Sequence, residues 1–278
     1  MVDRKIQQSQ VSPGACLKPG RGQPRNKVRH KESRYRLIAG RNPVLEALRS
    51  PGGLVRVVLL DSVRGGIIEE IRHAAEEAGI SVEILAREDF MEIARGAKAQ
   101  GVLALAQDKP PIDLESLLLQ MEGKDAPGFL LIPDQIEDPG NLGALIRTAE
   151  CAGADGVIVA RHHSASLSPG TIRASAGATE HVPVADAGNL VNAMKELKKR
   201  GFWIAGLDGK GDRLYTEVDY RGPIAIVVGS EGKGIRRLVR EQCDYLVRIP
   251  LFGKIESLNA SVAGALVMYE VSRQRATT

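Results

Sequence analysis

The chain has 278 residues, enough for about two domains that each bury a core of their own. Its 43% apolar and 26% charged residues are ordinary for a soluble globular protein. Aromatic residues make up only 4%, which argues against binding single-stranded nucleic acid by base stacking on aromatic platforms.

The net charge of +4 is unevenly distributed along the chain. Residues 1–31 hold eight Lys or Arg and one acid, a local charge of +7, and are rich in Gln, Gly and Pro. This composition predicts a disordered tail whose partner is a polyanion such as RNA. A solubilising or cloning-derived extension explains the same composition equally well.

The cysteine and histidine pattern argues against a metal site. Cys16, Cys151 and Cys243 are far apart and form no metal spacing and no disulfide framework, so a reducing cytoplasm fits. His162 and His163 are adjacent in a polar stretch without companion ligands. No window holds 18 apolar residues, and the N-terminus lacks the apolar core of a signal peptide. The sequence therefore predicts a cytoplasmic protein with no metal and no membrane segment.

Strand and helix patterns alternate after the tail. Asn42 and Pro43 suit the cap and the first residue of a helix. We expect strands at residues 35–40, 55–60, 81–85 and 101–106, and helices at 42–49, 66–78 and 87–94. This alternation predicts a small α/β domain over residues 32–106 with an at least partly parallel sheet. Its Arg and Lys side chains suit RNA docking, although a plain solvated face is the commoner reason for such residues.

A second alternating region follows residues 107–127, which we interpret as an interdomain linker that carries one helix. Residues 128–278 have predicted strands at 129–132, 157–160, 203–207, 224–228 and 245–249, and helices at 141–152, 169–178, 189–200, 233–242 and 257–273. The nearly continuous Val, Ile and Leu content of these strands indicates a parallel sheet covered on both faces. Ligands of such sheets bind beyond the carboxyl ends of the strands, so we examine the loops there.

The first of these loops leads into a helix with Asn141, Gly143 and Arg147. We expect Asn141 to cap this helix and Gly143 to allow a close approach. Arg147 stands among apolar residues, where a guanidinium needs an anionic partner such as phosphate or carboxylate. A structural ion pair with Glu137 or Glu150 satisfies the same need.

The second loop, residues 229–234, ends a strand with a glycine-rich turn and opens a helix. That arrangement is typical of a site for a nucleotide or another polar ligand. It matches neither common phosphate-binding glycine pattern, so alone it is weak evidence. Glu231 is either a partner of the helix dipole or a ligand contact.

The third loop follows the strand that ends at Ile249. We expect a helix to open on Ser257, with a recurring apolar face at Leu258, Val262, Leu266 and Tyr269. Ser257, Asn259 and Ser261 crowd its first turn, where free backbone N–H groups favour an electron-rich ligand. The small residues at 260 and 263–265 indicate that something approaches this backbone closely. A Ser-capped, tightly packed helix is the alternative.

The three loops together resemble a known family. Asp138-Pro-Gly-Asn-Leu-Gly with Arg147-Thr-Ala, Val228-Gly-Ser-Glu-Gly-Lys-Gly, and Ile249-Pro with Ser257-Leu-Asn-Ala-Ser closely resemble the three motifs of the SpoU/TrmH family. These are RNA ribose 2′-O-methyltransferases of the SPOUT class. Gly40-Arg-Asn-Pro-Val-Leu-Glu-Ala-Leu also resembles the L30e-like RNA-binding domain that precedes many such catalytic domains.

The resemblance implies an α/β SPOUT domain with a parallel sheet and a deep trefoil knot, which forms a homodimer. It is closest to the 23S rRNA guanosine 2′-O-methyltransferases, with S-adenosylmethionine as cofactor. The catalytic set that it implies is Asn141, Arg147, Glu231, Ser257 and Asn259, and the cofactor contacts are Gly229, Ile249 and Leu258.

The chemistry suggests roles for these residues. Because an arginine side chain stays protonated, we expect Arg147 to clamp the target phosphate or a developing alkoxide rather than act as a base. Asn259 and Ser257 then hold the hydroxyl and the donor, while Glu231 orients Arg147 or the loop. Two other functions stay open: methylation of a tRNA ribose, and a non-catalytic RNA-binding or ribosome-assembly factor on the same scaffold. The intact catalytic set counts against the second, and the N-terminal domain favours rRNA.

Overall fold

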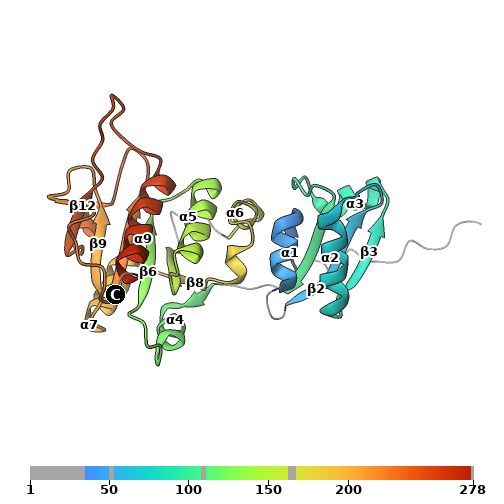
Figure 1. Ribbon diagram of the computed structural model, residues 1–278, viewed down its shortest axis with the longest axis horizontal. Helices are drawn as coiled ribbons and strands as arrows, with labels where there is room; N and C mark the ends of the chain where they lie inside the picture. Colours follow the sequence, from blue (N-terminus) through green and yellow to red (C-terminus); the bar gives the residue numbers. More distant parts are fainter. Residues whose placement is uncertain (1–34, 50–52, 108–110, 162–166, 277–278) are drawn as a thin grey trace, which may run out of the picture. The chain divides into compact units, whose positions relative to one another are not determined.

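The computed structural model describes residues 35–49, 53–107, 111–161 and 167–276 (Figure 1). The basic segment 1–31 with Cys16, and the pair His162–His163, lie outside these residues. Two sheets, each with its own helices, organise the described chain. None of the helices in these ranges is long and apolar enough to cross a membrane.

The first sheet has four strands in the order β1-β4-β2-β3. β1 (Tyr35–Ala39) and β2 (Leu54–Leu60) run antiparallel to β4 (Val102–Gln107), and β3 (Ser81–Leu85) runs parallel to β2. Buried residues of α1 (Arg41–Arg49) and α2 (Gly66–Glu77) pack on one face, and those of α3 (Arg87–Ala94) on the other. The predicted partly parallel α/β arrangement is confirmed.

One cap prediction in this region is wrong. α1 begins at Arg41, so Asn42 lies inside the helix rather than at its cap. Gly40, with a φ of 111°, makes the turn from β1, and its carbonyl accepts the N–H of Val44. Because glycine adopts this backbone conformation without strain, the helix starts immediately after it.

The second sheet has eight strands in the order β10-β12-β9-β11-β6-β7-β8-β5, and each pair is parallel. Its strands are β5 (Ile112–Asp113), β6 (Phe129–Asp134), β7 (Gly156–Ala160), β8 (Val184–Ala187), β9 (Trp203–Leu207), β10 (Arg213–Leu214), β11 (Ile224–Gly229) and β12 (Tyr245–Arg248). The predicted parallel sheet is confirmed. The sequence pattern missed β5, β8 and β10, because runs of two to four residues are too short to show a period.

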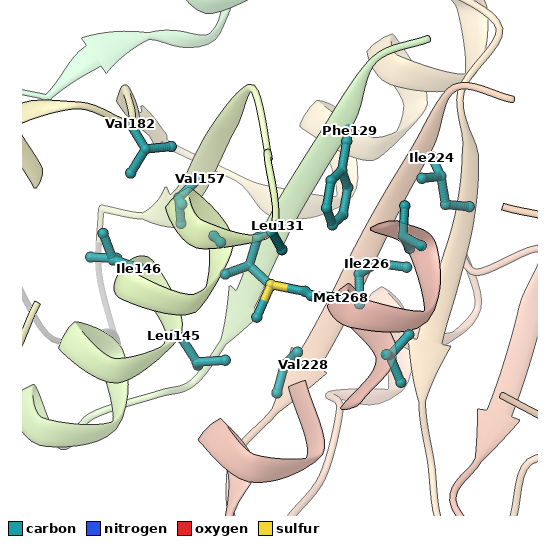
Figure 2. Close-up of a cluster of buried hydrophobic side chains, with 14 of the residues drawn as sticks. Phe129, Leu131, Leu145, Ile146, Val157, Val182, Ile224, Ile226, Val228 and Met268 are labelled. Carbon is teal, nitrogen blue, oxygen red and sulfur yellow. The ribbon is translucent and has the colours of Figure 1, made fainter. Parts of the chain in front are cut away.

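Helices cover both faces of this sheet. α5 (Pro139–Cys151) and α9 (Ala260–Ala276) share one apolar core with Leu131 and Ile226, seen in Figure 2. α4 (Leu114–Met121), α7 (Leu190–Lys199) and α8 (Arg237–Arg240) share the other with Leu130 and Ile132. Successive strand residues thus serve opposite faces, which explains the continuous apolar runs.

The segment expected to be a linker contributes to this sheet. β5 pairs with the edge strand β8, and the side chains of Leu117 and Leu118 on α4 are buried in the second core. Residues 112–121 are therefore part of the packed sheet rather than a free connection.

The strand order reverses beside β6. The chain runs outward from β6 through β7 to β8, then returns to form β9 and β11 on the opposite side of β6. α6 (Pro169–Ala174) and the short helix η2 (Ala178–Glu180) lie on the outward branch and pack against α5. In open α/β sheets the crevice beyond the carboxyl ends of strands at such a switch point is where ligands bind. The loops that follow β6 and β11 are therefore placed to form a site.

The last helix starts later than predicted. α9 begins at Ala260 rather than at Ser257. The predicted apolar face is present but exposed, with Val262 at 48%, Leu266 at 40% and Tyr269 at 53%. The side chains that α9 buries include Val267, Met268 and Val271, so the helix has apolar groups on two faces.

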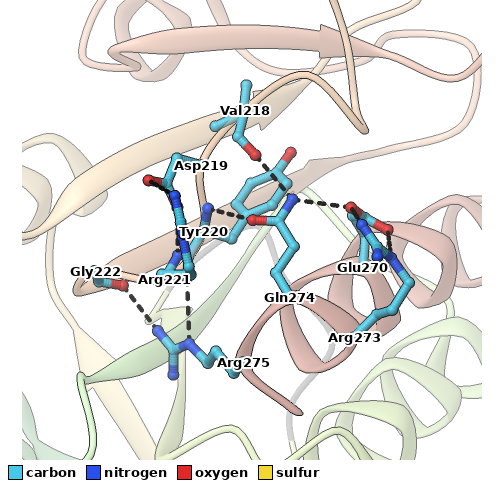
Figure 3. A network of polar contacts seen from close by, with 9 residues as sticks. All are labelled: Val218, Asp219, Tyr220, Arg221, Gly222, Glu270, Arg273, Gln274 and Arg275. Atoms are coloured by element: carbon cyan, nitrogen blue, oxygen red, sulfur yellow. Dashed lines mark hydrogen bonds and ion pairs between the residues drawn. The ribbon is translucent and has the colours of Figure 1, made fainter. Parts of the chain in front are cut away.

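A polar network holds the C-terminal end of α9 (Figure 3). The amide oxygen of Gln274 accepts the N–H of Tyr220 at 2.9 Å, and Arg275 Nε donates to the Tyr220 carbonyl at 3.2 Å. Glu270 accepts from Arg273 at 2.7 Å and from Gln274 at 2.8 Å, and these donors, Arg273 first, lower the pKa of that carboxyl. The network ties the C-terminal end of α9 to the segment that precedes β11.

Candidate active site

Three of the sequence-predicted residues meet beyond β6 and β11. Asn141 Nδ2 donates to Glu231 Oε1 at 3.0 Å, and Asn259 Nδ2 donates to the same oxygen at 2.5 Å. Asn259 Nδ2 also donates to Asn141 Oδ1 at 2.9 Å, and the backbone N–H of Ala260 donates to Glu231 Oε1 at 3.3 Å. Each of the three motifs contributes one member, and we call Asn141, Glu231 and Asn259 the amide–carboxylate cluster.

Asn141 reaches the cluster because another residue caps its helix. The side chain of Asp138 accepts the N–H of Asn141 at 2.7 Å, and Pro139 occupies the first helical position. The predicted cap at Asn141 is therefore wrong. Proline holds the residue before it in an extended conformation, which is the conformation of a cap, so Asp138 takes that role. The Asn141 amide is left free to contact Glu231.

Asn259, not Ser257, caps α9. Its Oδ1 accepts the N–H of Ser261 at 2.9 Å and that of Val262 at 3.3 Å, and the Ser261 hydroxyl donates to the same oxygen. Ser257 is exposed in the loop before the helix, and no hydrogen bond joins it to the cluster. Both residue types cap helices well, and the contact of Asn259 with Glu231 favours the later position.

Glu231 is presented by a loop that folds back on itself. The N–H of Gly234 donates to the carbonyl of Ser230 at 2.9 Å, with Gly234 at a φ of 65°. A Cβ on Gly229 would lie only 2.2 Å from the carbonyl carbon of Gly234. The predicted helix at 233–242 is reduced to the single turn of α8, because this fold-back occupies its first residues. Gly229 is thus needed for the shape of the loop itself.

An ion pair with a buried carboxylate anchors that loop to β6. Asp134 is fully buried and accepts from Arg236 three times: from the backbone N–H at 2.8 Å, from Nε at 2.7 Å and from Nη2 at 2.6 Å. The pair fixes the end of the glycine-rich loop against the strand that leads to Asn141. The sequence analysis missed it. An acid at the end of an otherwise apolar strand was the available signal, because a buried carboxylate needs a partner.

Arg147 is exposed on α5. Within the described ranges it makes no hydrogen bond or ion pair, so neither Glu137 nor Glu150 pairs with it, and Glu231 does not contact it. The expectation that Arg147 needs an anionic partner assumed that its apolar neighbours bury it, whereas α5 turns this position outward. Its charge is directed to solvent and is free to meet an anion.

The three expected cofactor contacts lie on two loops. Ile249 packs half-buried against the first core, and Leu258 is 37% exposed in the loop that leads to Asn259. These side chains offer apolar surface suited to an aromatic ring such as adenine, while Gly229 offers only backbone. These two side chains and the Gly229 backbone therefore fit a ligand that has both a flat apolar part and polar edges.

Other reactive groups are few. Across residues 35–49, 53–107, 111–161 and 167–276, no group of three or more His, Cys, Asp or Glu is arranged to hold a metal ion. The thiols of Cys151 and Cys243 are free, and burial raises the pKa of both, that of Cys243 to about 12. Neither thiol is therefore activated as a nucleophile.

Comparison with known proteins identifies the class. The profile of the SpoU rRNA methylase family matches residues 128–269, and a profile for RNA 2′-O ribose methyltransferase substrate binding matches residues 37–111. The chain belongs to the SpoU rRNA methylase family and is an RNA methyltransferase. Methylation of the ribose 2′-hydroxyl is characteristic of this family, which uses S-adenosylmethionine.

Relatives and solved structures agree with this assignment. YacO of Bacillus subtilis, assigned to the TrmH family of tRNA/rRNA methyltransferases, is 38% identical over 238 residues, which cover 86% of this chain and 95% of YacO. The SpoU methyltransferase AviRb of Streptomyces viridochromogenes has a TM-score of 0.73 at 25% identity, covering 91% of this chain and 94% of AviRb. A structure of an RNA 2′-O ribose methyltransferase has a TM-score of 0.72 at 28% identity, covering 90% and 93%. The predicted family and α/β fold are confirmed.

Proposed function

We propose that this chain transfers the methyl group of S-adenosylmethionine to the 2′-hydroxyl of a guanosine ribose in 23S rRNA. The observation that carries the proposal is the amide–carboxylate cluster, in which one residue from each motif converges at the switch point of the parallel sheet. The substrate-binding profile over residues 37–111 and the intact motifs support an enzyme rather than a binding factor.

The reaction needs an aligned hydroxyl and a place for its proton. The cofactor supplies an electrophilic methyl group: the 2′-oxygen forms a bond to it, the carbon–sulfur electrons return to sulfur, and the O–H proton is released. We place the cofactor against Ile249 and Leu258, with Gly229 presenting backbone to its polar edge. Positioning of this kind supplies much of the reduction in the barrier.

Glu231 is the residue that we place against the ribose. Its Oε1 accepts three N–H groups, from Asn141, Asn259 and Ala260, which hold the carboxylate in one orientation. Its second oxygen, Oε2, accepts no hydrogen bond within the described residues. That oxygen is the acceptor for the 2′-hydroxyl proton, and the two amides act as positioning groups.

Arg147 and Ser257 complete the proposed set. The exposed guanidinium of Arg147 clamps the target phosphate or the developing alkoxide, for which its fork of donors is suited. Ser257, two residues before the cap of α9, offers a hydroxyl to the ribose or the donor. Arg147→Lys tests the clamp: kcat/KM should fall at least about tenfold, since losing a paired hydrogen bond to a charged group costs more than 1.4 kcal/mol, and near-normal activity would refute it.

The organisation of the chain follows from this function. We assign residues 32–106 to an L30e-like RNA-binding domain and 128–278 to a SPOUT domain with a trefoil knot; of the connecting residues 107–127, those at 112–121 pack with the sheet of the SPOUT domain. In support of the knot, α9 follows the outer strand β12 yet packs back on α5 and β11. The basic residues 1–31 add RNA affinity, and the site of action is the cytoplasm.

A homodimer accounts for the exposed face of α9. Val262, Leu266 and Tyr269 border a groove of about 390 Å³ that Thr148 of α5 also lines. Exposed apolar surface of this kind is typical of an interface. The small residues of α9 have a separate explanation, because a Cβ on Gly264 would lie 2.5 Å from Leu145, within the chain's own core.

Mapping of ribose methylation tests the proposal. Loss of one 2′-O-methyl site in 23S rRNA when the gene is deleted, with recovery by the wild-type gene and not by a Glu231→Ala variant, is the expected result. A site lost from tRNA instead would establish the tRNA alternative. Calorimetry with S-adenosylmethionine distinguishes the proposed methyl transfer from a non-catalytic RNA-binding factor. Absence of binding at millimolar ligand would refute methyl transfer by this chain.

A further inference from the structure

A pocket of about 250 Å³ adjoins the amide–carboxylate cluster. Its walls come from the loop after β6 and the glycine-rich loop after β11, and Asn141 and Glu231 line it. The roles given above to the cofactor and the ribose do not use this space. The pocket therefore shares a wall with the catalytic cluster but has no assigned ligand.

Four polar side chains that line the pocket make no side-chain hydrogen bond or ion pair within the described part of the chain. They are Gln135, Glu137, Lys233 and Ser230, and the Ser230 hydroxyl is buried. Glu137 and Lys233 bring opposite charges to one cavity without pairing with each other. Gln135 has a φ of 57°, a left-handed conformation that is unfavourable for a residue with a side chain and that concentrates at ligand sites.

The reaction geometry determines what part of the substrate enters here. A nucleobase is attached to C1′ of the ribose, and C1′ is bonded to C2′, which carries the reacting hydroxyl. When that hydroxyl meets Glu231, the base of the same nucleotide must lie in the space next to Glu231. Single-stranded RNA bases are commonly read in this way, unstacked and by their Watson–Crick edges.

The charges in the pocket match one base better than the others. The Watson–Crick edge of guanine has the O6 acceptor next to two N–H donors, at N1 and N2. A carboxylate accepts from both donors and an ammonium donates to O6. Adenine and cytosine instead place an amino group where Lys233 needs an acceptor. Uracil has a single N–H between two carbonyl groups, one of which would face the Glu137 carboxylate.

We propose that this pocket binds the guanine base of the nucleotide that is methylated, with Glu137 accepting from N1–H and N2–H and Lys233 donating to O6. The proposal rests on the proposed function and deepens it. It assigns the base preference to Glu137 and Lys233, which are not among the residues proposed to carry out catalysis.

Nucleotide titration of the full-length protein tests the pocket without RNA or cofactor. Guanosine, inosine and adenosine 5′-monophosphates are titrated separately and followed by NMR chemical shifts. The dissociation constant for the guanosine nucleotide should be lower than that for inosine, which lacks the N2 amino group, by a factor of about ten, the weight of one hydrogen bond to a charged group. Equal binding of the guanosine and adenosine nucleotides overturns the proposal.

Matched variants assign the effect to the residues. Glu137→Gln should abolish the preference for guanosine over inosine, since an amide sets an N–H₂ group against the base donors. Lys233→Ala should weaken guanosine binding without restoring adenosine binding. Glu115→Gln on α4 and Lys195→Ala on α7, both exposed and remote in the chain, serve as controls that should match wild type. A preference that survives Glu137→Gln overturns the assignment.

Methyl transfer extends the test to the reaction. Once the methylated position is mapped, RNA with inosine at that position should react about tenfold more slowly than the guanosine RNA in wild type, and the two should react equally in Glu137→Gln. A mapped nucleotide other than guanosine overturns the proposal. Failure of the proposed function can be told apart from failure of the pocket proposal. The first would appear as absence of cofactor binding or of methylated RNA, whereas the nucleotide titration needs neither cofactor nor RNA and still shows whether the pocket prefers guanine.

Discussion

Replacing Glu231 with glutamine separates two roles that the structure gives to one carboxylate. Oε1 accepts from Asn141 at 3.0 Å, from Asn259 at 2.5 Å and from the Ala260 N–H at 3.3 Å. The carbonyl oxygen of glutamine can accept the same three donors. The group that disappears is Oε2, replaced by an N–H₂ group that cannot take a proton from a ribose hydroxyl.

The expected magnitudes differ strongly between stability and rate. Glu231→Ala loses three hydrogen bonds. At about 0.5 kcal/mol each, the low end of the usual range because Glu231 is exposed, the free energy of unfolding should fall by about 1.5 kcal/mol. Glu231→Gln should lose about 0.5 kcal/mol, because the three bonds remain. If Oε2 accepts the proton, Glu231→Gln should lower kcat by about 10²–10⁴, the usual effect of removing a general base.

Three measurements on the same variants check this reasoning. Urea denaturation gives the free energy of unfolding, calorimetry gives the affinity for S-adenosylmethionine, and single-turnover transfer of a radiolabelled methyl group gives the chemical step. Glu231→Gln should bind cofactor like wild type yet transfer slowly. A transfer rate within about threefold of wild type would refute Glu231 as the proton acceptor. A Glu231→Gln protein as unstable as Glu231→Ala would refute the view that Oε1 alone holds the cluster.

Three further predictions concern the scaffold of the site. Gly143→Ala puts a Cβ 2.4 Å from that of Ala174 and 2.6 Å from a backbone oxygen of α6. This overpacking should outweigh the gain in helix propensity and lower the free energy of unfolding, measured by urea denaturation, by about 2 kcal/mol. Gly170→Ala, whose Cβ would have no contact under 3.4 Å, should be neutral or slightly stabilising in the same assay. Asp134→Asn leaves Arg236 without a counter-charge and should lower the free energy of unfolding by about 3 kcal/mol. The loss should be smaller than for a fully buried ion pair because the Arg236 side chain is 36% exposed. An unchanged urea midpoint would contradict the anchoring role. If the proposed homodimer forms through the exposed face of α9, Leu266→Glu, which places a charge there, should shift sedimentation from dimer to monomer at equal protein concentration. A mass that stays dimeric would place the interface elsewhere.

Local signals in the sequence determined most of the scaffold. β3, β9 and α3 have the predicted bounds, because the apolar pattern of the strands and a clear helical period need no tertiary information. The motifs also identified Asn141, Glu231 and Asn259 as site residues before any geometry was available. The short strands β5 and β8 were missed, since their pairing depends on neighbours far away in the chain.

Competition between equivalent local signals was decided only by tertiary contacts. Asp138 and Asn141 are both good caps, as are Ser257 and Asn259, and the choice followed from Pro139 in one case and from Glu231 in the other.

Long-range pairing and solvent exposure were also beyond the sequence. The Asp134–Arg236 ion pair joins the end of β6 to the start of α8, about 100 residues further along the chain, and no local period in the sequence indicates such a partner. Periodicity correctly marked an apolar face on α9, but a period carries no information about what covers that face. The sequence by itself therefore determined most of the scaffold and the motif residues to consider for a site, while the tertiary structure decided which of them touch, because hydrogen-bond partners and burial are properties of the folded chain.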